Sequence, residues 1–193
     1  MKSHHKTILS KYYIPFEPKA KVNYLFLFRL YDIAKYNNET KCRDTIKYTS
    51  VSALAEQLET SRSTLNRIFN NADYMPFITV NKAAKRITIN NDIKGGKPFV
   101  CLNYSEVSAL VAVYDNLLCR YFIYIKYYCG YAKSKDNDFT IKQFLAACGY
   151  SQNSSYEQKI SEYNRILKEY EMIRIQPFID EKGHKRNKYS IPS

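Results

Sequence analysis

The stretch VSALAEQLETSRSTLNRIF, residues 51–69, decides the fold that we expect for this chain. Apolar residues recur in it at three- and four-residue intervals, first up to Leu58 and again from Leu65. That spacing gives a helix one apolar face. Ser50 and Ser61 precede the two segments, and serine is a favoured helix N-cap. The stretch therefore predicts two short helices joined by a tight turn.

A second copy of this pattern lies 90 residues further along the chain. Residues 50–58 (SVSALAEQL) and 140–148 (TIKQFLAAC) both open with a hydroxyl residue and share apolar second, fifth, sixth and ninth positions. The helices expected around the two copies span about 23–36 and 105–129 before them, and 61–70 and 155–171 after them. The agreement of the surroundings predicts an internal repeat.

Each copy ends in a predicted β-hairpin, over 77–89 in the first and 173–191 in the second. Gly183 suits the positive φ that hairpin turns often require. Phe99–Asn103 adds a short strand to either half. The fold class we expect is α+β, mainly α with β-hairpin wings.

The order helix, helix, turn, helix, hairpin thus occurs twice, which predicts two domains. We place them at 20–95 and 99–193, with a junction at the Gly-Gly stretch of 91–98. An N-terminal arm over 1–19 precedes them. We expect this arm to pack through Tyr12, Tyr13, Ile14 and Phe16.

This pattern resembles the tandem winged-helix DNA-binding proteins of bacterial mobile elements, with plasmid replication initiators and small accessory proteins of conjugative elements as the nearest groups. Residues 51–69 carry the most specific part of the likeness. The resemblance implies two tandem winged-helix domains. It also implies sequence-specific binding of double-stranded DNA in replication initiation or its control. Two alternatives stay open: a transcriptional regulator, and an adaptor whose winged helices dock a replication or transcription protein.

The residue types themselves favour DNA contact. A recognition helix fits the major groove, where Arg pairs with guanine and Asn with adenine, and hydroxyl groups bind phosphate. Basic side chains also gather on both predicted hairpins. The residues that we expect to contact DNA are Ser61, Arg62, Ser63, Thr64, Asn66, Arg67, Asn70, Lys82, Lys85 and Arg86 in the first half, and Ser155, Tyr156, Gln158, Lys159, Lys182, Lys185, Arg186 and Lys188 in the second.

The charge balance agrees with a polyanionic partner. The chain carries a net charge of +12 and has an isoelectric point near 9.4, and such a surplus favours nucleic acid or an anionic surface. Residues 1–98 hold +9 of it and residues 99–193 only +3. The acidic side chains of the second predicted recognition helix, among them Glu157 and Glu162, would repel phosphate. The first domain is therefore the expected main DNA contact, and the second domain contacts either DNA or a protein.

The apolar stretch 107–131 is long enough to suggest a membrane span. Asp115, Asn116, Arg120 and Lys126 interrupt it, and a bilayer core disfavours such groups. We therefore expect a buried helix and no membrane partner. Aromatic residues occupy more than one of its faces, which favours packing against the first domain. A homodimer interface and base stacking are the alternatives.

The sequence offers no catalytic constellation. Its three histidines do not cluster, its five cysteines include no CxxC pair, and Gly95-Gly96-Lys97 lacks the rest of a phosphate-binding loop. We expect no enzyme activity, metal, cofactor or disulfide framework. Free thiols, and a start without the apolar run of a signal peptide, indicate the cytoplasm.

Overall fold

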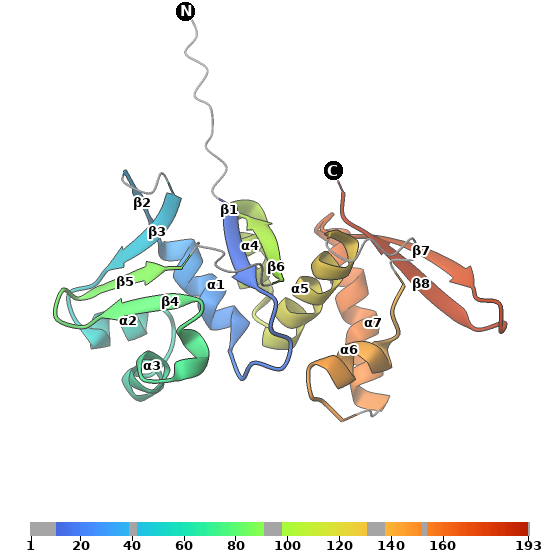
Figure 1. Cartoon of the computed structure of the whole chain (residues 1–193), viewed down its shortest axis with the longest axis horizontal. Coiled ribbons are helices and arrows are strands. Elements are labelled where there is room, and N and C mark those ends of the chain that lie inside the picture. Colours follow the sequence, from blue (N-terminus) through green and yellow to red (C-terminus); the bar gives the residue numbers. More distant parts are fainter. Residues whose placement is uncertain (1–10, 39–41, 91–97, 131–137, 152–153, 193) are drawn as a thin grey trace, which may run out of the picture.

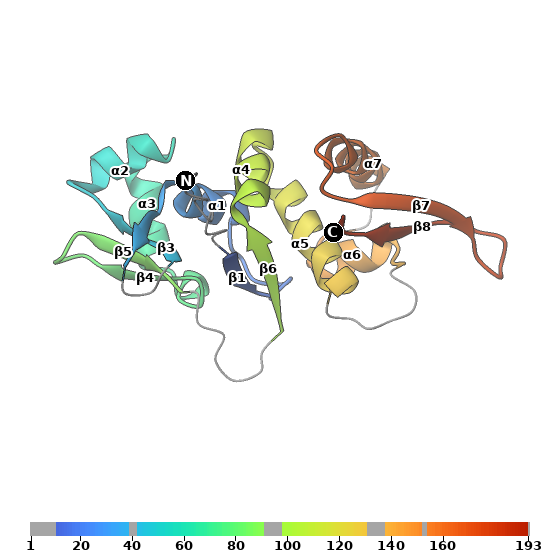
Figure 2. The same ribbon diagram turned by 90° about the horizontal axis from the view of Figure 1, so that it is seen from above.

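The computed structural model describes residues 11–38, 42–90, 98–130, 138–151 and 154–192. Within these residues it is a mixed α+β structure with seven α-helices and three small antiparallel sheets. The β4–β5 and β7–β8 hairpins extend toward opposite ends of its longest axis (Figure 1). Seen from above, β1, β6, α1 and α4 lie between the other elements of the two halves (Figure 2).

The N-terminal half follows the predicted order and adds two strands to it. Its elements are α1 (Tyr24–Ile33), β2 (Lys35–Asn37), β3 (Cys42–Lys47), α2 (Val51–Gln57), α3 (Arg62–Phe69), a 3-10 turn (Ala72–Tyr74), β4 (Ile78–Asn81) and β5 (Arg86–Ile89). The strand order of the sheet is β2-β3-β5-β4. The predicted first hairpin is therefore confirmed, and it is widened by β3, which pairs with β5.

The C-terminal half repeats this order. Its elements are α5 (Asn116–Gly130), α6 (Ile141–Ala147), α7 (Ser154–Glu169), β7 (Arg174–Ile179) and β8 (Lys185–Ser190). β7 and β8 form a two-stranded hairpin. A single antiparallel bridge from Asp138 to Lys188 stands where β3 pairs in the first half.

The repeat extends to details of the backbone. The Ser50 and Thr140 side chains cap α2 and α6 by accepting from the backbone N–H three residues ahead. After each helix the chain takes a left-handed conformation, at Glu59 (φ 50°) and Gly149 (φ 75°). The next backbone N–H then bonds back into the helix, from Thr60 to Ala55 at 2.9 Å in the first half. This is a helix-ending turn that favours glycine at the left-handed position.

Glu59 occupies that left-handed position at a cost that glycine avoids. We expect Glu59→Gly to stabilise the protein by about 1 kcal/mol, less what is lost with the 3.4 Å ion pair between the exposed Glu59 and the mostly buried Arg29. Glu56→Gly, inside α2, should instead destabilise it by about 1 kcal/mol. Urea unfolding of the three proteins measures both effects. Equal destabilisation by the two changes would contradict the assigned turn.

The single helix predicted over 105–129 is two helices, α4 (Tyr104–Val113) and α5. Tyr114 lies between them with φ of 64°, which ends α4. The Asp115 carboxylate then accepts from the backbone N–H groups of Leu117 (2.7 Å) and Leu118 (3.1 Å) and so caps α5. We expected Asp115 to interrupt a single apolar helix, whereas Asp115 caps the second of two helices.

The N-terminal strand closes the centre of the molecule. β1 (Lys11–Pro15) pairs with β6 (Phe99–Asn103). Tyr12 and Ile14 are buried, as the sequence predicted. The Tyr12 ring stacks on Tyr31 at 4.9 Å, and its hydroxyl donates to the Tyr31 carbonyl at 3.1 Å. The strand predicted at 99–103 therefore pairs with the N-terminal arm.

The helices α1 and α5 are buried on most of their faces and pack on each other. The Tyr24 backbone N–H at the start of α1 donates to Asn116 Oδ1 at the start of α5 at 2.7 Å. On its other faces α5 meets the arm, where Tyr127 stacks on Phe16 at 3.7 Å. Its extra aromatic surface therefore packs within the chain. Tyr131 and residues 91–97 of the predicted junction at 91–98 lie outside the described residues.

Candidate nucleic-acid interface

The helix α3 presents a polar, basic face to solvent because its apolar residues point inward. Leu65 and Ile68 are buried, whereas Arg62, Asn66 and Arg67 are exposed. Residues three and four apart are neighbours on a helix, and the exposed Ser63 is such a neighbour of both Asn66 and Arg67, as Arg62 is of Asn66, so these residues share one side. This is the side that the sequence predicted to face DNA.

Three hydroxyl groups gather at the N-terminus of α3. Ser61 Oγ accepts from the Thr64 backbone N–H at 3.1 Å and donates to Thr64 Oγ1 at 2.9 Å. Ser61 Oγ also lies 2.8 Å from Ser63 Oγ. Ser61 and Ser63 are exposed and Thr64 is half-buried. Ser61 is therefore the cap of α3, and the hydroxyls form a small polar cluster beside its exposed basic side.

The first hairpin is tied to the end of α3. Lys82 Nζ, in the turn between β4 and β5, donates to Asn70 Oδ1 at 2.7 Å. Asn70 Nδ2 donates in turn to the Asn66 carbonyl at 2.8 Å. Lys85 and Arg86 are exposed beyond this link. The helix face and the hairpin therefore form one continuous surface.

We call this the α3–hairpin surface and define it by its exposed side chains. These are Arg62, Ser63, Asn66, Arg67, Asn70, Lys82, Lys85 and Arg86. Between Ser61 and Asn91 the sequence carries five basic residues and one acidic residue, Asp73. No ion pair joins the basic members to another of the described residues. The surface therefore has uncompensated positive charge available for an anionic partner.

The start of α7 is the matching place in the C-terminal half. Ser155, Gln158 and Lys159 are exposed there, and Tyr156 is half-buried against Tyr150, with ring centroids 5.4 Å apart. Farther along the helix, Arg165 lies between Glu162 (3.6 Å) and Glu169 (2.6 Å). The basic charge of α7 is thus partly compensated by its own carboxylates, unlike that of α3.

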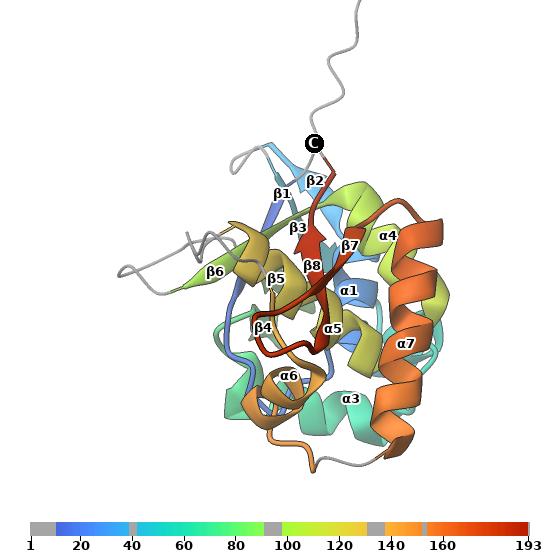
Figure 3. The ribbon, with the colours of Figure 1, turned by 90° about the vertical axis from the view of Figure 1, so that its right-hand side faces the viewer.

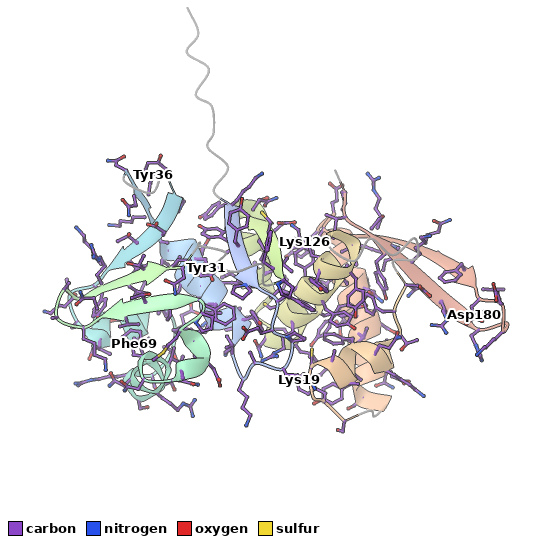
Figure 4. All side chains as sticks on the ribbon, in the orientation of Figure 1. Lys19, Tyr31, Tyr36, Phe69, Lys126 and Asp180 are labelled. Carbon is purple, nitrogen blue, oxygen red and sulfur yellow. The ribbon has the colours of Figure 1, made fainter. Side chains whose placement is uncertain are left out.

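Asp180 organises the tip of the second hairpin, which Figure 4 places at the far end of β7 and β8. Its carboxylate accepts from the backbone N–H groups of Lys182 (3.0 Å) and His184 (2.9 Å) and from Arg186 Nε (2.6 Å). These hydrogen bonds hold the pKa of Asp180 well below its usual value. Lys182 and Lys185 stay exposed at the tip, while the charge of Arg186 is neutralised.

The structure brings the first-half predictions together and separates those of the second half. Lys188 lies inside β8, half-buried, at the bridge to Asp138, rather than at the hairpin tip. The start of α7 and the tip of the β7–β8 hairpin lie apart, one on the lower side and one at the end of the molecule (Figure 1). The view from the right-hand side places α3 and the start of α7 on this same lower side (Figure 3).

Three basic residues beside α3 and the first hairpin were not among the predicted contacts. Lys47 is exposed on β3, directly opposite Arg86 in the register of β3 and β5. Its signal was hidden because the strand itself was not predicted. Lys21 and Arg120 were not predicted as contacts either, and both line a groove beside α3.

Comparisons with models of protein families, with curated proteins and with solved structures found no match to the chain. None of the helices in the described parts is both long and apolar enough to cross a membrane. Among the same residues, no group of three or more His, Cys, Asp or Glu side chains is placed to hold a metal ion. The site is therefore judged on its own geometry.

Proposed function

We propose that this chain is a non-enzymatic, sequence-specific double-stranded DNA-binding protein built from two tandem winged-helix domains. It acts in replication initiation or its control on a plasmid or another mobile element. The repeated order of helix, helix, turn, helix and hairpin supports the domain assignment. The process rests on the resemblance of residues 51–69 to such proteins.

The observation that carries the proposal is the α3–hairpin surface. Its basic residues have no ion-pair partners among the described residues, and the Lys82–Asn70 hydrogen bond joins helix and hairpin into one unit. Arg165 on α7 differs in this respect, because it is paired with Glu169 at 2.6 Å. Unpaired positive charge along a continuous surface is what phosphate binding requires.

The composition of the α3 face suits base recognition as well. The eight residues of α3 span about 12 Å, comparable with the width of the major groove. Arg62 and Arg67 can bond guanine bidentately, and Asn66 can bond adenine. Lys82, Lys85 and Arg86 on the hairpin would then bind the flanking phosphates. In this assignment α3 sets the sequence preference and the hairpin sets the affinity.

The C-terminal half would extend the contact with DNA along the duplex. α3 and the start of α7 lie on the same side of the molecule (Figures 1 and 3). A duplex along that side would meet both helices, with one hairpin toward each end. Because the second half has less net charge and more internal ion pairs, α3 makes the stronger contact.

Selection from a randomised duplex library, followed by sequencing, tests this proposal. We expect an enriched site with one dominant half, read by α3, and a weaker second half. The place of that site in the DNA around the gene then separates an origin of replication from a promoter, and so initiation from transcriptional regulation. A pool that stays random after several rounds at near-physiological salt would refute sequence recognition.

A protein-contact role for the C-terminal half is the second candidate, and one observation favours it. Ile179 is 68% exposed on β7, although isoleucine is usually buried. An apolar side chain on a protruding hairpin suits a protein partner better than a phosphate backbone. If the selected site has only one half, this role becomes the better assignment for that half.

A further inference from the structure

An open groove of about 470 Å³ lies between α3, the segment before α1 and the first turns of α5. Thr64, Arg67 and Asn71 line it from α3 and the turn after it. Lys21 lines it from the loop between β1 and α1, and Asn116 and Arg120 line it from α5. This loop lies on the same lower side as α3 (Figure 1). The groove therefore opens beside the α3–hairpin surface, shares Arg67 with it, and adds residues of the loop before α1 and of α5.

Three cations and no carboxylates line the groove among the described residues. Lys21 and Arg67 are exposed at its mouth and make no ion pair in the described part of the chain. Two carboxylates lie next to lining residues, at Asp73 and Asp115. The Asp115 carboxylate caps α5 and accepts from the Tyr163 hydroxyl at 2.7 Å, and neither carboxylate is part of the lining. The lining itself therefore carries three positive charges and no negative one among the described residues.

Arg120 is the unusual member of this set. It is only 8% exposed, and its guanidinium donates to the carbonyls of Pro18 (3.1 Å), Ala20 (2.7 Å) and Val22 (2.6 Å). Its Nε has no hydrogen-bond partner among the described residues. A buried charge without a counter-ion is unfavourable unless something compensates it. The carbonyls satisfy part of its hydrogen bonding and the face of the Tyr24 ring lies 5.2 Å from its guanidinium carbon, but both partners are neutral and neither supplies a counter-ion.

Two of the cations, Arg67 and Arg120, lie near the same polar residue of the lining, Tyr74. Tyr74 also lines the groove, and its hydroxyl accepts from the Asn23 backbone N–H at 2.9 Å. Burial raises the pKa of Tyr74, and both Arg67 and Arg120 lie near enough to oppose that rise. The side-chain oxygen of Asn116, Oδ1, accepts from the Tyr24 backbone N–H, which fixes the Asn116 side chain at the edge of the groove. Hydrogen bonds to the backbone therefore fix the positions of Tyr74 and Asn116 in the groove.

We infer that this groove binds a phosphate group, with Lys21, Arg67 and Arg120 as its counter-charges and Thr64 as a hydroxyl donor. Charge-assisted hydrogen bonds to phosphate are the strongest that these side chains make. The bound anion would relieve the repulsion among three cations that share one groove. The phosphate comes either from the backbone of a bound duplex or from a free phosphorylated ligand. Both sources present the same chemistry to the groove.

Lys21→Gln tests the inference without disturbing the core, because Lys21 is exposed. Lys19→Gln is the matched control: it removes the same charge from an exposed residue of the same loop that does not line the groove. Calorimetric titration with pyrophosphate at low salt gives the first reading. We expect measurable binding by the unchanged protein and by the control, and a three- to tenfold weaker affinity for Lys21→Gln.

Arg120→Gln should weaken pyrophosphate binding more than tenfold, since it removes the buried counter-charge. Circular dichroism checks that this variant is folded, and Lys21→Gln keeps the test valid if it is not. No pyrophosphate binding by the unchanged protein, together with duplex affinities that are equal for Lys21→Gln and Lys19→Gln, would overturn the inference.

Duplex titrations across a range of salt concentrations identify the source of the phosphate. If the groove holds a backbone phosphate, the negative slope of log K against log salt becomes shallower in Lys21→Gln than in Lys19→Gln, by about 0.9. If the groove holds a free ligand, Lys21→Gln binds pyrophosphate more weakly than Lys19→Gln, while the salt slopes of the two variants on the duplex are equal. The pyrophosphate arm stands even if the chain proves not to recognise a DNA sequence, so failure of the groove and failure of the proposed function are distinguishable.

Discussion

Reversal of four charges on the α3–hairpin surface, Arg62, Arg67, Lys85 and Arg86 to Glu, is expected to lower affinity for the selected duplex about a thousandfold or more. Each reversal removes a favourable contact and places a carboxylate against the DNA. These side chains are exposed and lack ion-pair partners among the described residues, so the fold should survive. Fluorescence anisotropy at fixed salt measures the loss.

A charge-matched control separates local contact from the general effect of net charge. Lys35, Lys142, Lys168 and Arg174 are exposed and lie outside the predicted contact set, and their reversal changes the net charge by the same amount. We expect this control to lose far less affinity, mainly through long-range electrostatics. Equal losses in the two variants would show that the α3–hairpin surface is not the contact.

Tyr121→Ala is expected to have the largest effect on stability, a loss of about 4 kcal/mol. Tyr121 is fully buried, with its ring 5.0 Å from Phe144 and its hydroxyl 2.9 Å from Asn164 Oδ1 and from the Tyr189 hydroxyl. The ring thus joins α5 to α6, α7 and β8 at once. Its truncation leaves a cavity, and the buried Tyr189 hydroxyl and the half-buried Asn164 amide each lose a hydrogen-bond partner. Urea unfolding measures the change.

Two further variants make this prediction specific. Tyr121→Phe keeps the ring and should cost about 1 to 2 kcal/mol, because Asn164 and Tyr189 lose only a hydrogen-bond partner. Tyr170→Ala removes a tyrosine that is 50% exposed and should change stability by less than about 0.5 kcal/mol. A small effect of Tyr121→Ala would mean that the C-terminal half does not depend on α5 for its core.

The sequence predicted the repeat well because that repeat is encoded locally. Ser50 and Thr140 act as the expected caps, and apolar spacing placed α2, α3, α6 and α7 to within a few residues. Both hairpins also formed where alternation and turn residues indicated. These features depend on contacts between residues close in sequence, which is where pattern carries information.

The missed elements depend on distant partners. β3 has the sequence CRDTIK, in which Ile46 is the buried apolar residue and Asp44 is a buried carboxylate. Nothing in that composition indicates a strand, and its conformation follows from pairing with β2 and β5. The break at Tyr114 had a readable signal, since Asp115 and Asn116 are cap residues, but the apolar stretch around them concealed it.

The residues of the candidate site were likewise predictable from the sequence only where local spacing determines their position. Exposure of the α3 residues followed from helical spacing alone, because Leu65 and Ile68 fix the buried side. The pairing of Arg186 with Asp180 and the position of Lys188 inside β8 could not be predicted, since both depend on the geometry of the hairpin. The groove beside α3 joins residues about 100 positions apart, such as Lys21 and Arg120, so no local pattern announces it.

The most direct test of DNA recognition is titration of the protein onto the DNA that flanks its own gene and onto a scrambled duplex of equal length. Anisotropy at low and near-physiological salt compares the two. Binding that persists only on the flanking DNA as salt rises is the result we predict. Binding that collapses equally on both duplexes would mean that counterion release alone drives association, and it would contradict sequence-specific recognition.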